Sequence, residues 1–309
     1  MAIIIDENSK VIIQGITGRV GKNFAERMAR HYKNFVGGVT PGKGGQEVCG
    51  KPVFNTVADA VTSLGANTSV IVVAAPYVKD AVFEALDAGI KTLWIYTDKV
   101  PVHDTMEMVQ YVQLKGARLI GPNSAGIVSP GKASASELNE DKLPLKPGEI
   151  GLVSKSGSLS YEVIHMIYEC GLGFSTVICV GGDPVLGTNI QDALSLFKDD
   201  PQTKAVVMLG EVGGSDEADS VETIKTMGKP VVAYIAGHSA PAKKKMGHAG
   251  AIVSSAADTA QGKSEVLREA GVHVVETIED LSLIHIWTSW RSAPHAGPAA
   301  GLECCCQKR

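Results

Sequence analysis

The chain has 309 residues and a mass of 32.4 kDa, and at about 150 residues per domain this length predicts two domains. A content of 44% hydrophobic and 20% charged residues is typical of globular proteins and excludes a fibrous or disordered chain. The 29 basic and 33 acidic residues give a net charge of −4, which offers no attraction to nucleic acid or to a membrane surface. No apolar run approaches the roughly 18 residues of a membrane span, and the start MAIIIDENSK has an acid where a signal peptide would carry basic residues. We therefore expect a cytoplasmic protein, or one of the mitochondrial matrix if its source is eukaryotic.

From Lys10 onward, short apolar runs alternate with stretches of helical period, which is typical of βαβ units and a parallel sheet. The predicted fold class is therefore α/β. In the first half we expect strands at Lys10–Gln14, Asn34–Val39, Ser69–Ala75, Thr92–Thr97 and Arg118–Ile120. We expect helices near Val20–His31, Val57–Leu64, Val78–Ala88 and Asp104–Lys115. These elements predict a first domain over residues 1–128.

Residues 129–148 are polar and rich in proline, which is typical of a linker. A second α/β domain is expected over 149–282. Its predicted strands lie near Ile150–Ser154, Thr176–Gly181, Ala205–Leu209 and Val231–Ile235, and its helices near Ser158–Tyr168, Ile190–Phe197, Glu217–Met227 and Ala260–Ala270. Residues 283–309 fit neither pattern, and we interpret them as a non-native segment from cloning, read-through or a frameshift, the alternative being a native metal-binding or interaction tail.

The six cysteines do not predict disulfides or a zinc site. Cys49, Cys170 and Cys179 are scattered among the expected elements, and Cys304, Cys305 and Cys306 are adjacent in the tail. No Cys-x-x-Cys pair with a second pair of ligands is present. We therefore expect reduced thiols and no metal site on this chain.

The loop after the first strand has the spacing of a phosphate-binding turn. It contains Gly15, Gly18 and Gly21 and leads into the first helix, whose N-terminus favours an anion. A tight structural turn is the alternative. An NAD site would need an acid at the end of the second strand, but that strand runs into a glycine loop carrying Lys43. This charge pattern favours coenzyme A, with its separate 3′-phosphate, over NAD, while a flexible loop with a solvated lysine is the other explanation.

In the second half, His248 lies among small residues in the segment MGHAGAI, where a phosphate could approach the ring. A loop histidine on its own is more often solvated or structural. Two neighbours favour a functional role: the run from Ser154 to Ser158 follows a strand and opens a helix, and Glu211 ends another strand. A carboxylate bonded to one ring nitrogen would fix the tautomer and leave the other nitrogen nucleophilic.

Gly262, Lys263 and Ser264 imitate the end of a nucleotide-binding P-loop. That motif needs a glycine five places before Gly262, and Ala257 stands there instead. No expected strand leads directly into the segment either. The chain therefore has candidate phosphate sites and a candidate phosphoryl acceptor without a recognisable nucleotide triphosphate site, which implies a partner chain.

Taken together, the segments QGITG, GGVTPGKGG, SGSLSYE, GGDPVLG, GEVGGS and MGHAGAI resemble the family of succinate–CoA ligase α subunits, over roughly Ile4 to Leu281. The resemblance implies an N-terminal Rossmann-like CoA-binding domain and a C-terminal flavodoxin-like ligase domain. It also implies a β subunit with an ATP-grasp fold, which would hold Mg²⁺ and ATP or GTP. The implied reaction interconverts succinate, CoA and a nucleoside triphosphate with succinyl-CoA, the diphosphate and phosphate, and it belongs to the tricarboxylic acid cycle.

The same resemblance implies roles for individual residues. His248 would carry the phosphoryl group and Glu211 would orient it. Tyr161 would lie at the acid's site. The residues implied to hold CoA are Thr17, Gly18, Arg19, Val20, Lys43, Tyr96, Thr97 and Asp98, and those implied to hold phosphate are Ser154 and Ser156.

The chain departs from familiar bacterial members near the domain junction. It carries ASASELNEDKLPL after Lys132, and Ser124 stands where a cysteine follows Gly-Pro-Asn in those members. Malate–CoA ligase and related acyl-CoA synthetases share the same core motifs, so the acid stays open between succinate and malate. A non-catalytic CoA-binding module and an NAD(P)-dependent oxidoreductase are further alternatives, the latter disfavoured by the missing acid at the second strand.

Overall fold

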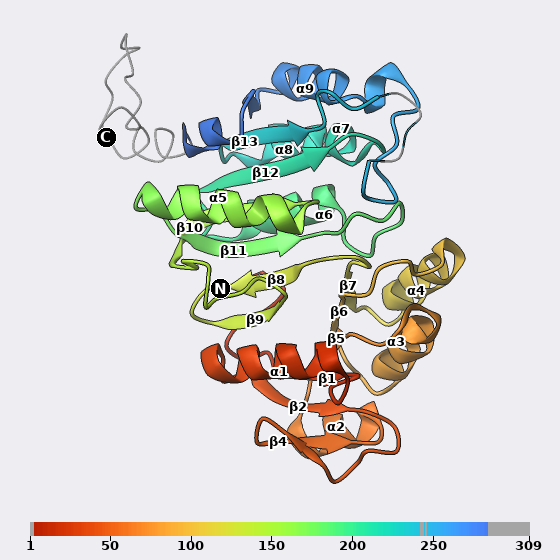
Figure 1. Cartoon of the computed structure of the whole chain (residues 1–309). Helices are drawn as coiled ribbons and strands as arrows, with labels where there is room; N and C mark the ends of the chain where they lie inside the picture. The colour runs from red at the N-terminus through yellow and green to blue at the C-terminus, as the bar shows by residue number, and fades with distance from the viewer. Residues whose placement is uncertain (1–2, 242–243, 245, 284–309) are drawn as a thin grey trace.

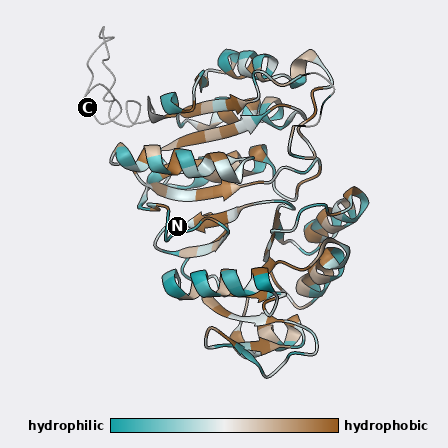
Figure 2. Cartoon of the chain, in the orientation of Figure 1, coloured by the Kyte–Doolittle hydropathy of each residue, from teal (hydrophilic) through white to brown (hydrophobic). Residues whose placement is uncertain are grey.

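The computed structural model describes residues 3–241, 244 and 246–283, and it forms two stacked α/β units (Figure 1). Each unit is built on its own seven-stranded sheet with helices on the faces of the sheet. The α/β prediction is therefore confirmed. Figure 2 shows apolar strands in the interior of both units and polar residues on the outer faces of the helices. This is the pattern that burial of apolar surface produces.

The first unit has the strand order β3-β4-β2-β1-β5-β6-β7. Apart from the edge strand β3, this is the 3-2-1-4-5-6 order of the Rossmann fold, in which ligands bind outside the carboxyl ends of the strands. The elements are β1 Val11–Gln14, α1 Arg19–His31, β2 Phe35–Val39, β3 Glu47–Val48, β4 Lys51–Phe54, α2 Val57–Leu64, β5 Thr68–Ile71, the 3₁₀ turn Ala75–Tyr77, α3 Val78–Asp87, β6 Thr92–Ile95, α4 Val102–Leu114 and β7 Arg118–Ile120.

The second sheet has the order β14-β13-β12-β10-β11-β8-β9. Its parallel part, read from β11 to β14, is the 2-1-3-4-5 order of the flavodoxin fold. The elements are β8 Gly126–Ser129, β9 Ala133–Ser136, β10 Pro147–Ser154, α5 Gly157–Glu169, β11 Phe174–Cys179, α6 Ile190–Asp199, β12 Ala205–Glu211, α7 Asp216–Asp219, α8 Val221–Met227, β13 Val231–Ala236, the 3₁₀ turn Ala256–Asp258, α9 Ala260–Glu269, β14 His273–Val274 and the 3₁₀ turn Glu279–Leu283.

The apolar runs predicted the buried parallel strands well, because each of these strands contains a run of apolar residues. Strands β1, β5 and β11 are buried at every position. The single helix predicted over Glu217–Met227 is instead two helices, α7 and α8, separated at Ser220. The hydroxyl of Ser220 donates to the carbonyl of Glu217 at 2.7 Å, a local bond that competes with helix continuation.

The segment 129–148, expected to be a linker, contains regular structure, because Ser129 ends β8 and residues 133–136 form β9 of the second sheet. Strand β9 pairs with β8 in antiparallel fashion, and β8 pairs with β11. Both strands lie between the two units in Figure 1. Their small polar side chains are buried and bonded: the Ser129 hydroxyl donates to the carbonyl of Ile5 at 3.1 Å and lies 2.9 Å from the Thr176 hydroxyl. A polar composition here reflects an interface between layers, and the division at 128 and 149 stays a prediction.

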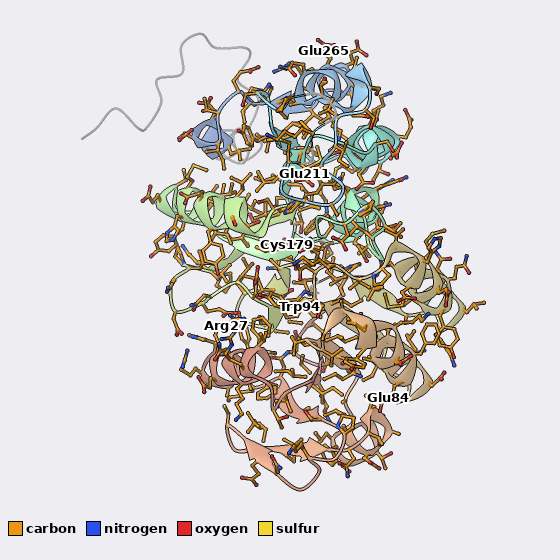
Figure 3. All side chains as sticks on the ribbon, turned by 45° about the vertical axis from the view of Figure 1, so that its right-hand side comes forward. Arg27, Glu84, Trp94, Cys179, Glu211 and Glu265 are labelled. Carbon is orange, nitrogen blue, oxygen red and sulfur yellow. The ribbon has the colours of Figure 1, made fainter. Side chains whose placement is uncertain are left out.

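The junction between the units is packed and contains an ion pair. Trp94, at the end of the first sheet, is fully buried and donates from Nε1 to the carbonyl of Ser124 at 3.0 Å. Arg27 of α1 donates to the carbonyl of Glu137 at 2.9 Å, and its Nε lies 3.3 Å from Oε2 of Glu140. Figure 3 shows Arg27 and Trp94 where the two units meet. These contacts tie α1 to the segment that follows β9.

None of the helices in the described part of the chain is long and apolar enough to cross a membrane. Cys179 is buried, and burial raises the pKa of its thiol to about 12, so it is an unreactive packing residue. The proposed non-native tail lies outside the described residues apart from Leu283, as do the three cysteines within it.

Candidate functional site

A cavity of about 630 Å³ opens between the two units at the carboxyl ends of their strands. This is where open α/β sheets bind ligands. Predicted site residues from both halves of the chain line it, namely Val20, Tyr96, Thr97, Asp98, Ser156 and His248. The structure thus brings together candidates separated by more than half of the sequence.

His248 is paired with Glu211 as predicted. Nδ1 of the ring lies 2.7 Å from Oε2 of Glu211, with 31% of the histidine side chain and 12% of the glutamate side chain exposed. Glu211 is the last residue of β12 and lies inside the second unit (Figure 3). The hydrogen bond to Glu211 raises the pKa of His248; burial opposes this rise and so does Lys155, while the charges of Glu211 and Asp183 add to it. A ring held in this way has Nδ1 bound and Nε2 left to act.

Glycines make room for this histidine. A Cβ on Gly182 would lie 2.3 Å from Cγ of His248, which no side chain can occupy. Gly213 has a φ of +85°, and a Cβ there would lie 2.4 Å from the carbonyl oxygen of Gly250 in the His248 loop. The glycines of GGDPVLG and GEVGGS are therefore needed for the close approach of three loops around the ring.

The N-terminus of α5 opens onto the same cavity through Lys155, Ser156, Gly157 and Ser158. No acidic residue lies in the first turn of this helix, so its free N–H groups present a positive end to the cavity. Ser156 lines the cavity, but its hydroxyl accepts the N–H of Leu159 at 3.2 Å as the helix cap.

Ser154 is not among the lining residues. It is fully buried, and its hydroxyl both donates to the carbonyl of Ser156 at 2.8 Å and accepts the N–H of Ser156 at 3.0 Å. Ser154 therefore shapes the turn that presents α5. Its predicted contact with phosphate stays a prediction.

The predicted CoA residues of the first loop lie at the start of α1. Gly18 caps this helix, Arg19 is exposed in its first turn, and that turn contains no acidic residue. Thr17 donates from its backbone N–H to the hydroxyl of Thr40 at 3.4 Å, which ties the loop to the end of β2. Lys43 is exposed in the following turn and does not line the cavity. Together with the exposed side chains of Arg19 and Lys43, the loop forms an open, positively charged surface on the first unit, which we call the rim.

Tyr161 is half-buried on α5 and also does not line the cavity. Its hydroxyl accepts the N–H of Asn139 at 3.0 Å and lies 3.4 Å from the carbonyl oxygen of Glu137. Glu137 does line the cavity, and burial raises the pKa of its carboxyl group. Tyr161 thus holds the segment that supplies a wall of the cavity.

Glu137 was not predicted from the sequence as a cavity residue, and Lys155 was predicted only as a member of the run from Ser154 to Ser158, with no role for its amine. Glu137 lies in the segment that was interpreted as a linker because of its polar composition, so this glutamate was not considered as a site residue. Lys155 is 9% exposed, and its Nζ lies 3.0 Å from Oδ2 of Asp216. Burial disfavours the charged form of Lys155, but the carboxylates of Glu217 and Asp216 outweigh it and raise the pKa of the amine. The sequence signal for Lys155 was its place between the end of a strand and the start of a helix, where anions bind.

The fold and the site together define a CoA ligase. Residues 6–99 match the CoA binding domain family, and residues 153–273 match the CoA-ligase family. The first match covers the loop before α1, and the second covers both Glu211 and His248.

Comparison with curated relatives narrows this class. The α subunit 2 of an ADP-forming succinate–CoA ligase from Archaeoglobus fulgidus is 50% identical over 277 residues, covering 90% of this chain and 96% of the relative. The corresponding α subunit from Aquifex aeolicus is 46% identical, covering 89% and 91%. The malate–CoA ligase α subunit from Methylorubrum extorquens is 45% identical, covering 89% and 94%. The chain belongs to the family of succinate–CoA ligase α subunits, as the sequence motifs predicted.

Solved structures of related fold include the ATP citrate lyase of Methanosaeta concilii in complex with (3S)-citryl-CoA, with a TM-score of 0.84 and 23% identity. The alignment covers 96% of this chain and 53% of the lyase chain, so this chain spans about half the length of that protein. A dinucleotide-forming acetyl-coenzyme A synthetase from Ca. Korarchaeum cryptofilum has a TM-score of 0.72 and 20% identity, covering 89% of this chain and 60% of that one. These likenesses concern the fold alone.

Proposed function

We propose that this chain is the α subunit of a succinate–CoA ligase, which interconverts succinate, CoA and a nucleoside triphosphate with succinyl-CoA, the diphosphate and phosphate. The observation that carries the proposal is the pair formed by His248 and Glu211 at a cavity shared by both units. The relatives named above, at 45–50% identity over about nine-tenths of the chain, support it.

His248 is the proposed phosphoryl carrier. With Nδ1–H donated to Glu211, the lone pair on Nε2 attacks phosphorus, and an N–P bond forms as the bond to the departing oxygen breaks. In the next step a carboxylate oxygen of the acid displaces Nε2 and becomes an acyl phosphate. The CoA thiolate then attacks the acyl carbon and releases phosphate. Glu211 stabilises the cationic ring in each transfer of the phosphoryl group.

The N-terminus of α5 is the proposed cradle for that phosphoryl group. Its free N–H groups and the ammonium of Lys155 supply positive charge to the cavity without any acid in the first turn. Ser156 would present its backbone at this end. Ser154 would contribute by holding the turn, and direct contact with phosphate through its hydroxyl would require that hydroxyl to exchange partners.

The proposed CoA site runs along the first unit. Arg19 and Lys43 would meet phosphates of CoA at the open rim, with Thr17 and Gly18 supplying the backbone of the loop. The thiol end would enter the cavity past Val20, Tyr96, Thr97 and Asp98. The fit rests on the acid-free first turn of α1 and on the two exposed cations beside it.

We infer a β subunit as the partner, because the relatives are named as α subunits. ATP or GTP, with Mg²⁺, is proposed to bind to that subunit and to deliver the phosphoryl group to His248. A cytoplasmic location stays a prediction.

Malate is the second candidate acid. The malate–CoA ligase α subunit is 45% identical to this chain, which matches the identity of several succinate–CoA ligase relatives. Glu137 lines the cavity and lies in the segment 133–146, where the chain departs from familiar members. This residue is a place where the two acids would be distinguished.

The test is co-purification with the β subunit of the same organism, followed by phosphorylation with labelled ATP or GTP and by CoA thioester assays on a panel of carboxylic acids. We expect acid-labile phosphate on the wild-type chain, none on His248→Asn, and thioester from succinate. Thioester from malate alone would support the second candidate. CoA binding without phosphate transfer to any acid would contradict the proposal and favour a non-catalytic CoA-binding module.

A further inference from the structure

The P-loop imitation at Gly262, Lys263 and Ser264 lies inside α9. A Cβ on Gly262 would lie 2.3 Å from the carbonyl oxygen of Ala256, so the glycine serves the close packing of this helix. Lys263 is 1% exposed and points into the second unit. This segment therefore does not form a nucleotide loop, and the buried ammonium has another role.

All three N–H bonds of the Lys263 ammonium are used. Nζ donates to the carbonyl of Glu211 at 2.8 Å, to the carbonyl of Gly213 at 2.5 Å and to Oε2 of Glu217 at 2.5 Å. A lysine ammonium has three donors and no acceptor, so its hydrogen-bonding capacity is filled. The backbone turn that carries Glu211 thus closes around one buried cation.

Glu217 binds both Lys263 and the backbone of this turn, each through a different carboxylate oxygen. Its Oε1 accepts the backbone N–H of Glu211 at 3.0 Å, while its Oε2 binds Lys263. The side chains of Glu217 and Lys263 are both 0% exposed. Both backbone groups of Glu211 are therefore bound by this one ion pair.

The sheet explains why these partners are needed. The ladder between β10 and β12 ends at Ser154 opposite Leu209, two residues before Glu211. Beyond that point the backbone of β12 has no neighbouring strand on the β10 side, and unpaired buried groups are costly. Glu217 and Lys263 replace the missing strand.

Stability alone is a weak explanation for such a pair. Two buried charges lose their hydration, and replacing a buried ion pair by apolar side chains of similar size is often neutral or stabilising. The pair does fix the backbone of the one residue whose carboxylate lies 2.7 Å from Nδ1 of His248.

We propose that Lys263 and Glu217 are positioning residues that hold the carboxylate of Glu211 against Nδ1 of His248 for phosphoryl transfer. The inference rests on the proposed role of His248 as the phosphoryl carrier. Neither residue reaches the ring itself; they act by fixing the peptide groups on both sides of the Glu211 Cα.

The test replaces both partners at once, because removing one would leave a buried charge uncompensated. The double variant Lys263→Met/Glu217→Met removes both charges of the pair, while Lys155, whose Nζ lies 3.9 Å from Oε1 of Glu217, keeps its ion pair with Asp216 at 3.0 Å. Its matched control is Arg268→Met/Glu276→Gln, an exposed ion pair whose arginine lies on the same helix. Folding is checked by urea unfolding of each full-length chain.

Two readouts follow for chains that fold. In an NMR titration of the His248 ring, assigned with His248→Asn, the Met/Met variant is expected to titrate at a lower pH than the wild type, because the ring loses its carboxylate. Asp183 and Lys155, the other charged groups that act on the ring, are not substituted, and Lys155 keeps its ion pair with Asp216. In complex with the β subunit, its rate of phosphorylation is expected to fall about tenfold to hundredfold, the size expected from loss of a hydrogen bond to a charged group. The control is expected to match the wild type in both.

A folded Met/Met variant with the wild-type titration and rate would overturn the proposal. If that variant does not fold, Glu217→Asp decides: it keeps the negative charge beside Lys263, but its side chain is one methylene shorter and cannot reach both Lys263 Nζ and the Glu211 N–H, so the titration is expected to move in the same direction. A wild-type titration in folded Glu217→Asp would overturn the proposal as well. A wild-type complex that takes up no phosphate would instead refute the proposed function, and the titration would still report on the positioning of the ring.

Discussion

The bond between His248 and Glu211 predicts an unusual response to Glu211→Gln. The substitution keeps the shape of the side chain and removes its charge from a position 2.7 Å from Nδ1. A hydrogen bond to a charged group contributes about 1.5–3 kcal/mol, and because 31% of the His248 side chain is exposed we use the lower end. A loss of about 1.5 kcal/mol corresponds to about a tenfold slower phosphorylation of His248 at a pH where the ring is neutral.

The same substitution is expected to move the pH profile to lower pH. Glu211 raises the pKa of His248 above its ordinary value of 6.5, and only the neutral ring accepts a phosphoryl group. Without the carboxylate the pKa of His248 falls, so the acidic limb of the rate–pH profile moves to lower pH, while the maximal rate on the plateau decreases. General damage to the fold would lower the rate at every pH without moving the limb.

The free energy of unfolding gives an independent check on the direction of the His248 pKa shift. A pKa raised on folding contributes stability that is present below the unfolded value and is lost as pH rises through the folded pKa. The difference in unfolding free energy between the wild type and Glu211→Gln is therefore expected to shrink as the pH rises above the ordinary value of 6.5 and through the folded pKa of His248. The assays are acid-labile phosphate incorporation from labelled ATP across pH, and urea unfolding at matched pH. An acidic limb that stays in place in Glu211→Gln would refute the reasoning.

Four further variants test other parts of the site. Gly182→Ala places a Cβ 2.3 Å from Cγ of His248 and is expected to abolish phosphorylation in a folded chain; normal labelling would contradict the packing argument. Lys43→Ala is expected to raise the KM for CoA about fivefold, about 1 kcal/mol for an exposed ion pair, with phosphorylation of His248 unchanged; an unchanged KM would remove Lys43 from the CoA site. Tyr161→Phe loses the bond from the Asn139 N–H and is expected to raise the KM for the acid while that for CoA stays the same; equal changes in both would indicate a structural role only. Deletion of residues 284–309 is expected to leave acid-labile labelling intact, and loss of labelling in a folded chain would favour a native tail.

Sequence reasoning found the parallel strands and the ends at which the site lies. Strands such as β1 and β11 are buried throughout and mostly apolar, and glycines or serines follow such strands where backbone must approach a ligand or a helix must begin. His248 and Glu211 could be paired in advance because parallel strands bring their carboxyl ends to one edge of the sheet. The distance of 2.7 Å between Nδ1 of His248 and Oε2 of Glu211 agrees with that expectation.

Sequence reasoning missed residues whose polar character suggests exposure but which the fold buries. Ala133–Ser136 has the small polar residues of a linker, but it is a buried strand whose two serine hydroxyls bond to each other and to Glu140. Lys263 was read as part of a failed motif, because a lysine is usually solvated and only the fold shows that its ammonium is enclosed by two carbonyls and a carboxylate. Long-range partners of this kind depend on strand order, which local patterns do not contain.

The central claim is that His248 carries the phosphoryl group in a complex that forms a CoA thioester. The most direct measurement is single-turnover labelling of the complex with its β subunit, with the label located on this chain by mass spectrometry under alkaline conditions and then chased with succinate and CoA. The account predicts label on His248 that disappears on the chase as succinyl-CoA forms. Thioester formation by a complex carrying His248→Asn, or label that does not leave His248 on the chase, would contradict it.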